Sequence, residues 1–450
     1  MSFTVYYSDT AETTRRGFGK VARIPCIFDT CPKYHRLGSR YLIDRGIGEW
    51  APESRRVTVR VSTPSEQSIR NYAHWLANFL EWAEVRGLDL TTCTYREHIQ
   101  SRYQTEMLKG FWSRDGLPLS PRTINLRVQQ ACDFLTWMAD KGLRSKFDIP
   151  YNSIKLKWGS AYSSVGHLEK TTLSRKGKLR ENKRRLHMPT NPEILTWLGE
   201  VLSRFGTTKA LMCETVLLTA MRREEVSCLR LDTLPEDPRE WHISNPDAPL
   251  EDQRLLVAIC FGTKGQNYGI QNGDKIGPER TIMIPYTLAA KLHNYRQTLR
   301  NKSLKNFVSR AQSPKEKRIR IQEAVHLFLS EKNGARIKSK DLYNAWTGVK
   351  LPFKGWSPHL GRDWWACSTL WSELKRHEGL IAQGSAVASA LLESTAMSIL
   401  RFRIQPQLGH AHDATTMIYL QWAVDLFGAS LPTLYEQDLL DQNPKYDIYK

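Results

Sequence analysis

Two segments of this chain carry the same helix start and stop signals, and they constrain the fold of its first half more than any other feature. The first segment begins at Thr63-Pro64-Ser65-Glu66, which combines an N-cap, a proline and a capping-box glutamate, and it ends at Gly87. The second begins at Ser120-Pro121 and ends at Gly142. Apolar residues recur at helical spacing in both, namely Ile69, Tyr72, Leu76, Phe79, Leu80 and Ala83, then Ile124, Val128, Ala131, Leu135 and Met138. The pair predicts a small all-helical domain, with a third helix between them near residues 95–108.

Length and composition predict a globular protein with more than one domain. The chain has 450 residues, of which 41% are hydrophobic and 25% charged, values close to ordinary globular usage. No window approaches the roughly 20 consecutive apolar residues that a membrane span needs, and the first residues lack the apolar core of a secretory signal. The eight cysteines stand mostly alone in apolar segments. These features predict a soluble cytoplasmic protein with reduced thiols and no membrane partner.

The chain carries an excess of positive charge. Its 65 Lys and Arg residues outnumber its 46 Asp and Glu residues, which gives a formal net charge of +19. Dense Lys and Arg favour a polyanionic partner, most simply nucleic acid, because they displace counterions from phosphates. From Lys170 to Arg185 the only acidic residue is Glu181, so this stretch is predicted to be an extended linker along a DNA backbone. The last 26 residues are instead acidic, which favours contact with a basic surface.

The second half is predicted to be mainly helical with a small β-sheet. Helices are expected at 191–205, at 208–219 and from residue 224, and strands at 254–261 and 280–285. A polar, Gly-rich stretch between the strands is typical of a long hairpin connection. These patterns divide the chain into an N-terminal extension of undefined fold (1–60), a helical domain (61–165), a basic linker (166–188), a second domain with a small sheet (189–424) and an acidic tail (425–450). Cys26, Cys31 and His35 fit no standard zinc spacing, and no metal site is predicted.

Three short segments of the second half carry Arg, His and Tyr at recurring offsets. In the first, Arg222 is followed by Glu225 and then by Leu229-Arg-Leu-Asp232; the second reads Pro358-His359-Leu-Gly-Arg362; the third reads Gln407-Leu408-Gly409-His410, with Tyr419 nine residues after the histidine. Their order and spacing resemble the conserved boxes of the tyrosine recombinase (phage integrase) family over residues 186–423. The helical domain at 61–150 resembles the core-binding domain of that family. The resemblance implies a SAM-like helical domain followed by a mixed α+β catalytic domain.

The resemblance also implies the role of each box residue. Tyr419 would be the nucleophile that forms a covalent 3′-phosphotyrosyl intermediate, and Arg222 and Arg362 would clamp the scissile phosphate. His359 and His410 would be acid, base or hydrogen-bonding groups, and Glu225 would orient its neighbours. The family's lysine, which protonates the leaving 5′-oxygen, is matched best by Lys264, with Lys275 as the competitor because the hairpin connection is long.

These residue types suit the chemistry independently of the resemblance. Cleavage of a phosphodiester needs a nucleophile, a clamp for the non-bridging oxygens and an acid for the leaving oxygen. A phenol can be the nucleophile, a guanidinium group presents a fixed fork of donors to a phosphate, and imidazole moves protons near neutral pH. Arg223 and His412 remain alternatives to their neighbours Arg222 and His410.

The boxes also depart from the family pattern. Asp363 follows Arg362 where the family often has His, and 48 residues separate Arg362 from His410, roughly twice the expected distance. The added segment, residues 377–397, is rich in Ala, Ser and Leu and is predicted to add a helix. Both departures indicate a divergent branch of the family.

The resemblance implies a site-specific DNA recombinase or integrase of a mobile element or a related system, needing neither metal nor nucleotide cofactor. Four protomers would act on duplex DNA with specific recombination sites, with accessory DNA-bending proteins as further partners and the acidic tail between protomers. A telomere resolvase, a type IB topoisomerase and an inactive DNA-binding relative remain alternatives. Backbone contacts with DNA are expected from Arg70, Arg122, Arg127, Arg175, Lys176, Lys178, Arg180, Arg184 and Arg185.

Overall fold

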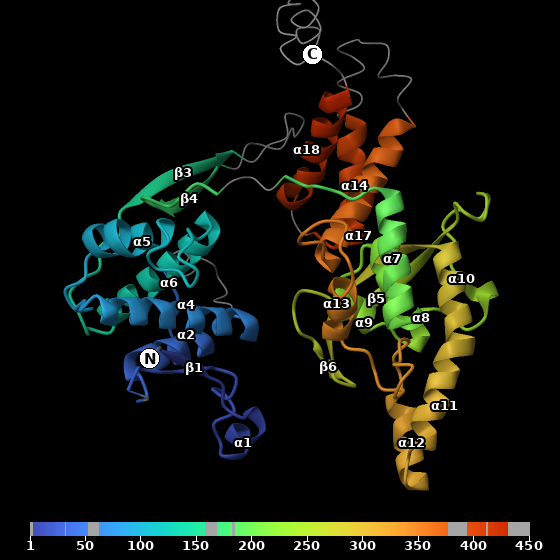
Figure 1. The fold of residues 1–450 in the computed structure, drawn as a ribbon, viewed down its shortest axis with the longest axis horizontal. Coiled ribbons are helices and arrows are strands. Elements are labelled where there is room, and N and C mark those ends of the chain that lie inside the picture. The colour runs from blue at the N-terminus through green and yellow to red at the C-terminus, as the bar shows by residue number, and fades with distance from the viewer. Residues whose placement is uncertain are drawn as a thin grey trace, which may run out of the picture. The chain divides into compact units, whose positions relative to one another are not determined.

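The computed structural model describes residues 3–31, 33–52, 63–157, 169–181, 185–376, 394–410 and 413–430. The chain divides into two compact units, residues 1–183 and 184–450 (Figure 1). Helices predominate and the sheets are small, so the predicted fold class, mainly α with a little β, is confirmed. In the described part of the chain, no helix combines the length and the apolar character that crossing a membrane requires.

The first unit contains helices and two antiparallel β-hairpins. Its elements are β1 (Thr4–Tyr6), α1 (Thr10–Arg15), β2 (Cys26–Phe28), α2 (Arg36–Ile47), α4 (Glu66–Val85), the π-helix η1 (Tyr95–Gln104), α5 (Thr105–Leu108), α6 (Pro121–Asp140), β3 (Tyr151–Lys157) and β4 (Glu169–Arg175). Strand β1 pairs with β2, and β3 pairs with β4.

The two predicted amphipathic helices are α4 and α6, and their caps form as the sequence indicates. The hydroxyl of Ser65 accepts the N–H of Ser68, and the hydroxyl of Ser120 accepts that of Thr123. Gly87 and Gly142, just beyond the helix ends, adopt positive φ values of 59° and 70°, a conformation that favours glycine. The apolar stripes of α4 and α6 pack together in one core, in which the repeated Phe and Trp residues stack within each helix.

Residues before position 53 share the core of this helical unit. The Tyr41 hydroxyl accepts a hydrogen bond from the Gln130 amide at 2.6 Å, and Trp137 Nε1 donates to Asp44 Oδ2 at 2.9 Å. Tyr41 is fully buried and its ring contacts Phe134 edge-on. The expected domain boundary at residue 60 therefore does not separate two cores, because the buried Tyr41 of α2 packs against α6 within one core.

Part of the predicted basic linker is also folded. Residues 169–175 form β4, and the expected DNA contact Arg175 lies inside the first unit, only 5% exposed. Its guanidinium group donates to the Tyr95 hydroxyl at 2.5 Å and to Gln104 Oε1 at 3.2 Å. Arg175 is thus a buried partner of η1 and is not available on the surface, contrary to the prediction.

The second unit contains a three-stranded sheet surrounded by helices. Its elements are α7 (Asn191–Phe205), α8 (Thr207–Thr219), α9 (Arg223–Ser227), the 3-10 helices η2 (Leu231–Thr233) and η3 (Pro238–Glu240), β5 (Arg254–Phe261), β6 (Gly269–Gln271), β7 (Asp274–Pro285), α10 (Tyr286–Tyr295), the π-helix η4 (Arg296–Arg300), α11 (Asn301–Ser309), α12 (Pro314–Glu323), α13 (Ser339–Thr347), α14 (Pro358–Lys375), the π-helix η5 (Leu400–Ile404), α17 (Gln405–Leu408) and α18 (Asp413–Ser430). The strand order is β5-β7-β6, and all pairs are antiparallel.

The predicted strand at 254–261 is confirmed as β5, whereas the Gly-rich stretch after it is more ordered than expected. Residues 269–271 form β6, and the third strand begins at Asp274, six residues before the predicted start. A tight turn at Asn272 and Gly273, both with positive φ, joins β6 to β7. The polar, Gly-rich composition therefore gave no local signal for the short second hairpin formed by β6 and β7.

A close helix contact places the His-x-x-Arg box. Gly361 lies in α14 between His359 and Arg362, and a Cβ atom added there would come 2.5 Å from the Trp346 ring. Trp346 lies on α13, and the same Cβ atom would come 3.4 Å from Leu217 of α8, on which α14 packs. Helix α18 lies beside α14 (Figure 1). Helices α14, α17 and α18 and the end of α8 share a core that includes Ala220, Leu408 and Tyr419.

Several predictions fall wholly or partly outside the described residues. Of the added segment at 377–397, residues 394–397 are described and are helical. Of the acidic tail at 425–450, residues 425–430 are described and belong to α18. Arg184 and His412 lie outside the described residues. The eight cysteines are all described, and none forms a disulfide.

Candidate active site

The sequence boxes meet in the second unit, although four different elements carry them. Arg222 is the N-cap residue of α9, directly after a sharp turn in which Ala220 has a φ of 53°. Arg362 lies in the first turns of α14. His410 follows α17, and Tyr419 lies on α18.

The turn at Leu408 and Gly409 is the point on which the two arginines converge. Arg222 Nη2 donates to the carbonyl oxygens of Leu408 at 3.1 Å and Gly409 at 3.3 Å. Arg362 Nη2 donates to the same Leu408 oxygen at 2.6 Å. Gly409 has a φ of 61°, and a Cβ atom there would come 3.0 Å from a guanidinium nitrogen of Arg280. The Leu-Gly-His sequence therefore forms a turn whose carbonyl oxygens accept hydrogen bonds from two guanidinium groups, and the left-handed conformation of this turn favours glycine.

Glu225 connects Arg222 to a third arginine. Its carboxylate is fully buried and accepts hydrogen bonds from the Arg222 backbone N–H at 2.7 Å and from Arg222 Nη1 at 2.9 Å. It also accepts one from Arg280 Nη2 at 2.8 Å. One carboxylate thus orients two cations that would otherwise repel each other, as expected for a residue that positions its neighbours.

Arg280 is a member of this cluster that the sequence interpretation missed. It lies on β7, and its Nη1 donates to the Gln407 carbonyl at 3.2 Å. Burial, together with the nearby charge of Arg222, lowers the pKa of Arg280, which Glu225 partly offsets. Arg280 alternates in phase with the buried residues Ile282 and Ile284, so a charged residue on the apolar face of a strand was the available signal.

Gln407, in the third box, fixes the turn to the sheet and to α8. Its amide nitrogen donates to the carbonyls of Thr219 at 2.7 Å and Met283 at 2.9 Å, and its amide oxygen accepts the Met283 N–H at 2.8 Å. The Gln407 side chain therefore joins the third box to the start of the first box and to β7 through main-chain groups, in addition to the contacts of the arginines.

Arg362 is the most deeply buried cation of the cluster. It is 4% exposed, and its Nε donates to the Ala220 carbonyl at 2.6 Å. Burial, and then the neighbouring charge of Arg222, lowers its pKa to about 10. Arg362 remains protonated at neutral pH, and in a partly desolvated site its charge acts more strongly on an anion than it would in water.

The two histidines differ in their surroundings. His359, on the first turn of α14, is exposed. His410 is half-buried, and its Nδ1 is 3.3 Å from the Thr416 hydroxyl. Burial, followed by the charges of Arg362, Arg222, His359 and Arg280, lowers the pKa of His410 to about 4. His410 is therefore neutral at physiological pH and can donate or accept a hydrogen bond beside the arginines.

Tyr419 lies against His410 and Asp363. Its ring stacks on the His410 ring with a centroid separation of 6.4 Å and an interplanar angle of 12°. Its hydroxyl donates a 2.8 Å hydrogen bond to Asp363 Oδ1, and both side chains are buried. Burial and the Asp363 carboxylate raise the pKa of Tyr419, so the phenol is protonated at neutral pH.

The two candidate lysines lie on different parts of the hairpin: Lys264 follows β5, and Lys275 is the second residue of β7. Lys264 is exposed, and it makes no hydrogen bond or ion pair with the residues that the structure describes. Lys275 Nζ donates to the Gly265 carbonyl at 2.6 Å, which occupies it within the hairpin. The Lys264 side chain is therefore the more available of the two.

The expected DNA contacts of the first unit are unequal in exposure. Arg122, Lys176, Lys178, Arg180 and Arg185, which lies just beyond this unit, are exposed. Arg70 pairs with Glu66 at 2.7 Å, and Arg127 donates to Asn78 at 3.1 Å, so both are half-buried. The exposed residues suit phosphate contacts better than the paired ones.

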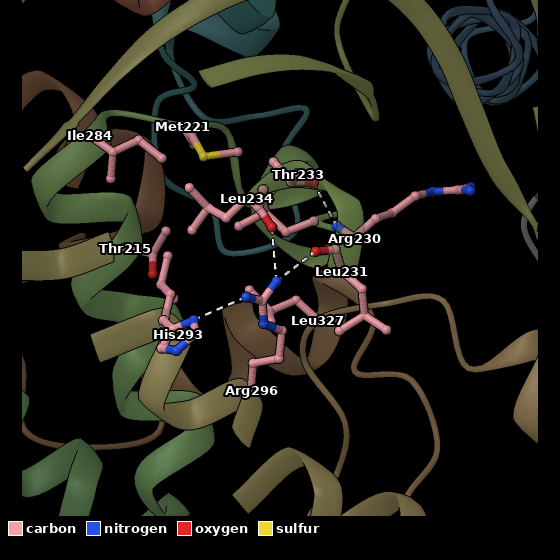
Figure 2. A pocket seen from close by; sticks show the side chains of 12 residues that line it. Thr215, Met221, Arg230, Leu231, Thr233, Leu234, Ile284, His293, Arg296 and Leu327 are labelled. Atoms are coloured by element: carbon pink, nitrogen blue, oxygen red, sulfur yellow. Dashed lines mark hydrogen bonds between the residues drawn. The ribbon is translucent and has the colours of Figure 1, made fainter. Parts of the chain in front are cut away.

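Figure 2 shows a separate pocket, whose lining includes residues of α8, η2, α10 and η4. Apolar side chains such as Met221 and Leu327 line it, together with Arg296. Arg296 donates to the carbonyls of Leu231 at 3.1 Å and Leu234 at 2.8 Å (Figure 2). Arg296 thus holds the segment that follows α9, and the pocket is structural. In the parts of the chain that the structure describes, His, Cys, Asp and Glu form no group of three or more suited to a metal ion.

Comparison with known proteins found distant structural similarities and no sequence match. No protein-family model and no curated protein sequence matches the chain. Similar solved structures include the XerH site-specific recombinase bound to palindromic difH substrate, with 16% identity and a TM-score of 0.47, covering 89% of both chains. The Tn1549 transposon integrase in complex with circular intermediate DNA has 12% identity and a TM-score of 0.45, covering 87% of this chain and 98% of its own. A lambda integrase dimer bound to a core site has 12% identity and a TM-score of 0.43, covering 86% and 94%.

Each of these solved structures is similar to the chain over most of its length, with a TM-score below 0.5. The values describe a distant similarity, and the function proposed below rests on the geometry of the arginine cluster.

Proposed function

We propose that this protein is a site-specific DNA recombinase that cleaves and rejoins DNA strands through Tyr419. The observation that carries the proposal is the convergence of Arg222 and Arg362 on one turn, with a neutral His410 and a buried tyrosine beside it. Guanidinium groups and a tyrosine in one place suit a phosphodiester, since the reaction transfers a phosphoryl group from one oxygen to another.

Each residue of the cluster has a distinct part in the proposed reaction. Arg222 and Arg362 bind the non-bridging oxygens and stabilise the charge that develops on them. Attack by the Tyr419 oxygen forms a 3′-phosphotyrosyl bond and releases the 5′-oxygen, which takes a proton from Lys264. Attack by a 5′-hydroxyl of another strand then reverses the step, and the retained bond energy makes ATP unnecessary.

The exposed basic residues supply the affinity for DNA in this proposal. Arg122, Lys176, Lys178, Arg180 and Arg185 would contact backbone phosphates and make binding depend on salt. The resemblance of the boxes further supports four protomers on two recombination sites, with the acidic C-terminal tail between protomers.

A trapping experiment tests the proposed reaction. The full-length protein is incubated with nicked duplexes drawn from the DNA that borders its gene, so that a short fragment leaves after cleavage and rejoining fails. We expect a covalent protein–DNA adduct that survives denaturation and carries the DNA on Tyr419, as mass spectrometry of the digested adduct would show.

Matched variants decide which residues take part. Tyr419→Phe should give no adduct while binding DNA normally, and Tyr286→Phe, at a half-buried tyrosine on α10, is the control that should leave the yield unchanged. An equal adduct yield from Tyr419→Phe would refute the nucleophile. Relaxation of a supercoiled plasmid that lacks any recombination site would instead favour the topoisomerase alternative.

A further inference from the structure

Among the residues that the structure describes, Asp363 provides the carboxylate that is hydrogen-bonded to the hydroxyl of Tyr419. Oδ1 of Asp363 lies 2.8 Å from the phenolic oxygen, which donates the bond, and Asp363 and Tyr419 are 5% and 2% exposed. Asp363 directly follows Arg362 on α14, at a position where the resemblance leads one to expect histidine. The departure from the family pattern thus lies against the proposed reacting atom.

A buried phenol needs a proton acceptor if it is to attack phosphorus. The raised pKa of Tyr419 keeps its proton in place at neutral pH, and a phenol that kept it throughout the reaction would be a poor nucleophile. A general base must lie within about 2.6–3.2 Å of the proton donor. The Asp363 carboxylate meets this distance in the structure as it stands.

Other groups around the phenol are less suited to accept its proton. The His410 ring lies parallel to the tyrosine ring, and its Nδ1 faces the Thr416 hydroxyl. Burial and Asp363 raise the pKa of the Cys367 thiol, so that thiol is protonated. Arg362 is a cation that can stabilise a developing phenolate but cannot accept a proton from it.

We propose that Asp363 is the general base that accepts the Tyr419 proton during strand cleavage and returns it during rejoining. This inference rests on the proposed recombinase function. In cleavage, a bond forms between the Tyr419 oxygen and phosphorus, the bond from phosphorus to the 5′-oxygen breaks, and the phenolic proton moves to Asp363 Oδ1. In rejoining, the 5′-hydroxyl gives its proton to Lys264 and attacks phosphorus, the bond from phosphorus to the Tyr419 oxygen breaks, and the protonated Asp363 gives its proton back to the phenol.

The same hydrogen bond has a contrasting interpretation with an opposite kinetic consequence. If Asp363 only holds the phenol in a resting position, its removal would free Tyr419 and leave cleavage unchanged or faster. If Asp363 is the base, its removal would slow cleavage by roughly 10²- to 10⁴-fold, the usual contribution of general base catalysis. The sign of the change therefore separates the two roles.

The test is single-turnover cleavage of the nicked duplex that the wild-type protein traps, at saturating protein. Asp363→Asn should lower the cleavage rate by roughly 10²-fold or more without changing DNA affinity, and Asp363→Glu should recover part of the rate. Glu373→Gln, which removes a carboxylate of the same helix that pairs with Arg403, is the matched control and should cleave at the wild-type rate. If the asparagine variant does not fold, Asp363→Ala provides the same comparison, and a cleavage rate in it at or above that of the wild type would contradict the inference, because alanine cannot accept a proton.

A second readout distinguishes a base from a structural contact. Replacing Tyr419 with a fluorinated tyrosine lowers the pKa of the phenol, so the cleavage rate depends less on the proton acceptor. The defect of Asp363→Asn should then shrink by about 10-fold or more, since the barrier to proton removal is smaller. A defect of undiminished size, or a cleavage rate in Asp363→Asn at or above that of the wild type, would overturn the inference while the wild-type adduct still supports the recombinase. Absence of any adduct from the wild type would overturn both.

Discussion

Glu225 should be among the most sensitive positions of the catalytic unit, although it does no chemistry in the proposed reaction. Its buried carboxylate accepts hydrogen bonds from Arg222 and from Arg280. Replacing it with Gln leaves one acceptor oxygen where two were used and turns an N–H group toward other donors. Breaking a buried ion pair from one side costs about 3–5 kcal/mol, because the remaining charge stays buried without its partner.

The structure sets the expected value near the lower end of that range. Arg222 and Arg280 keep side-chain exposures of 22% and 15%, and Arg222 retains its contacts with the Leu408 and Gly409 carbonyls. We therefore expect Glu225→Gln to lower the free energy of unfolding by about 3 kcal/mol. Urea unfolding of the full-length chain, followed by tryptophan fluorescence, measures this change.

A matched surface pair provides the control for Glu225. Glu214 pairs with Lys291 at 2.6 Å, but the lysine side chain is 57% exposed, so Glu214→Gln should cost about 0–1 kcal/mol. Adding Arg280→Met to Glu225→Gln removes one of the stranded cations and should recover about 1–2 kcal/mol as a coupling energy. Equal losses for Glu225→Gln and Glu214→Gln would refute the reasoning that the carboxylate neutralises a buried arginine pair.

Three further predictions follow from the same structure. Gly409→Ala should lower the free energy of unfolding by about 1–2 kcal/mol, because a side chain is strained at a φ of 61°, and a loss no larger than that of Ala→Gly at an exposed loop position would contradict this. The folded-state pKa of His410, about 4, lies below its unfolded value of about 6.5. The unfolded chain therefore binds the proton first, and stability should fall as the pH drops from about 6.5 to 4, by at most about 3 kcal/mol. His410→Gln should flatten this dependence in urea unfolding measured at each pH, and identical pH profiles for the variant and the wild type would show that His410 is not its source. Lys178→Gln should weaken DNA binding and reduce the slope of log affinity against log salt by about 1, as fluorescence anisotropy would show. Arg175→Gln should instead mainly lower the thermal unfolding midpoint of the first unit, measured by calorimetry. A loss of DNA affinity without a loss of stability in Arg175→Gln would contradict the burial of this side chain.

Local features of the sequence were sufficient to predict the helices that carry most of the fold. The caps at Ser65 and Ser120 and the glycines at 87 and 142 are short-range signals, since each depends on hydrogen bonds within a few residues. The helix at 191–205 was predicted with the observed bounds for the same reason, and the strand at 254–261 was predicted from its run of apolar residues. The second hairpin was missed because β6 is short and Gly-rich, and its strand is stabilised by pairing with β7, which no local pattern reveals.

Some residues of the candidate site were likewise predicted from the sequence, and another was found only in the structure. Arg222, Arg362, His410 and Tyr419 stand in recognisable boxes, so the sequence nominated them, and the structure brings them together. Arg280 stands in no box, and it joins the arginine cluster only because β7 pairs with β5 and packs on α17.

The amino-acid sequence alone determined which side chains this protein has for the chemistry of a phosphodiester, because residue type and spacing are local properties of the chain. Only the tertiary structure decided the electrostatic state of those side chains. Whether an arginine is buried beside a carboxylate, whether a histidine is neutral and which group holds a tyrosine hydroxyl depend on neighbours tens or hundreds of residues away. Asp363 makes this plain: in the sequence it is a departure from a box, and in the fold it is the hydrogen-bond partner of Tyr419.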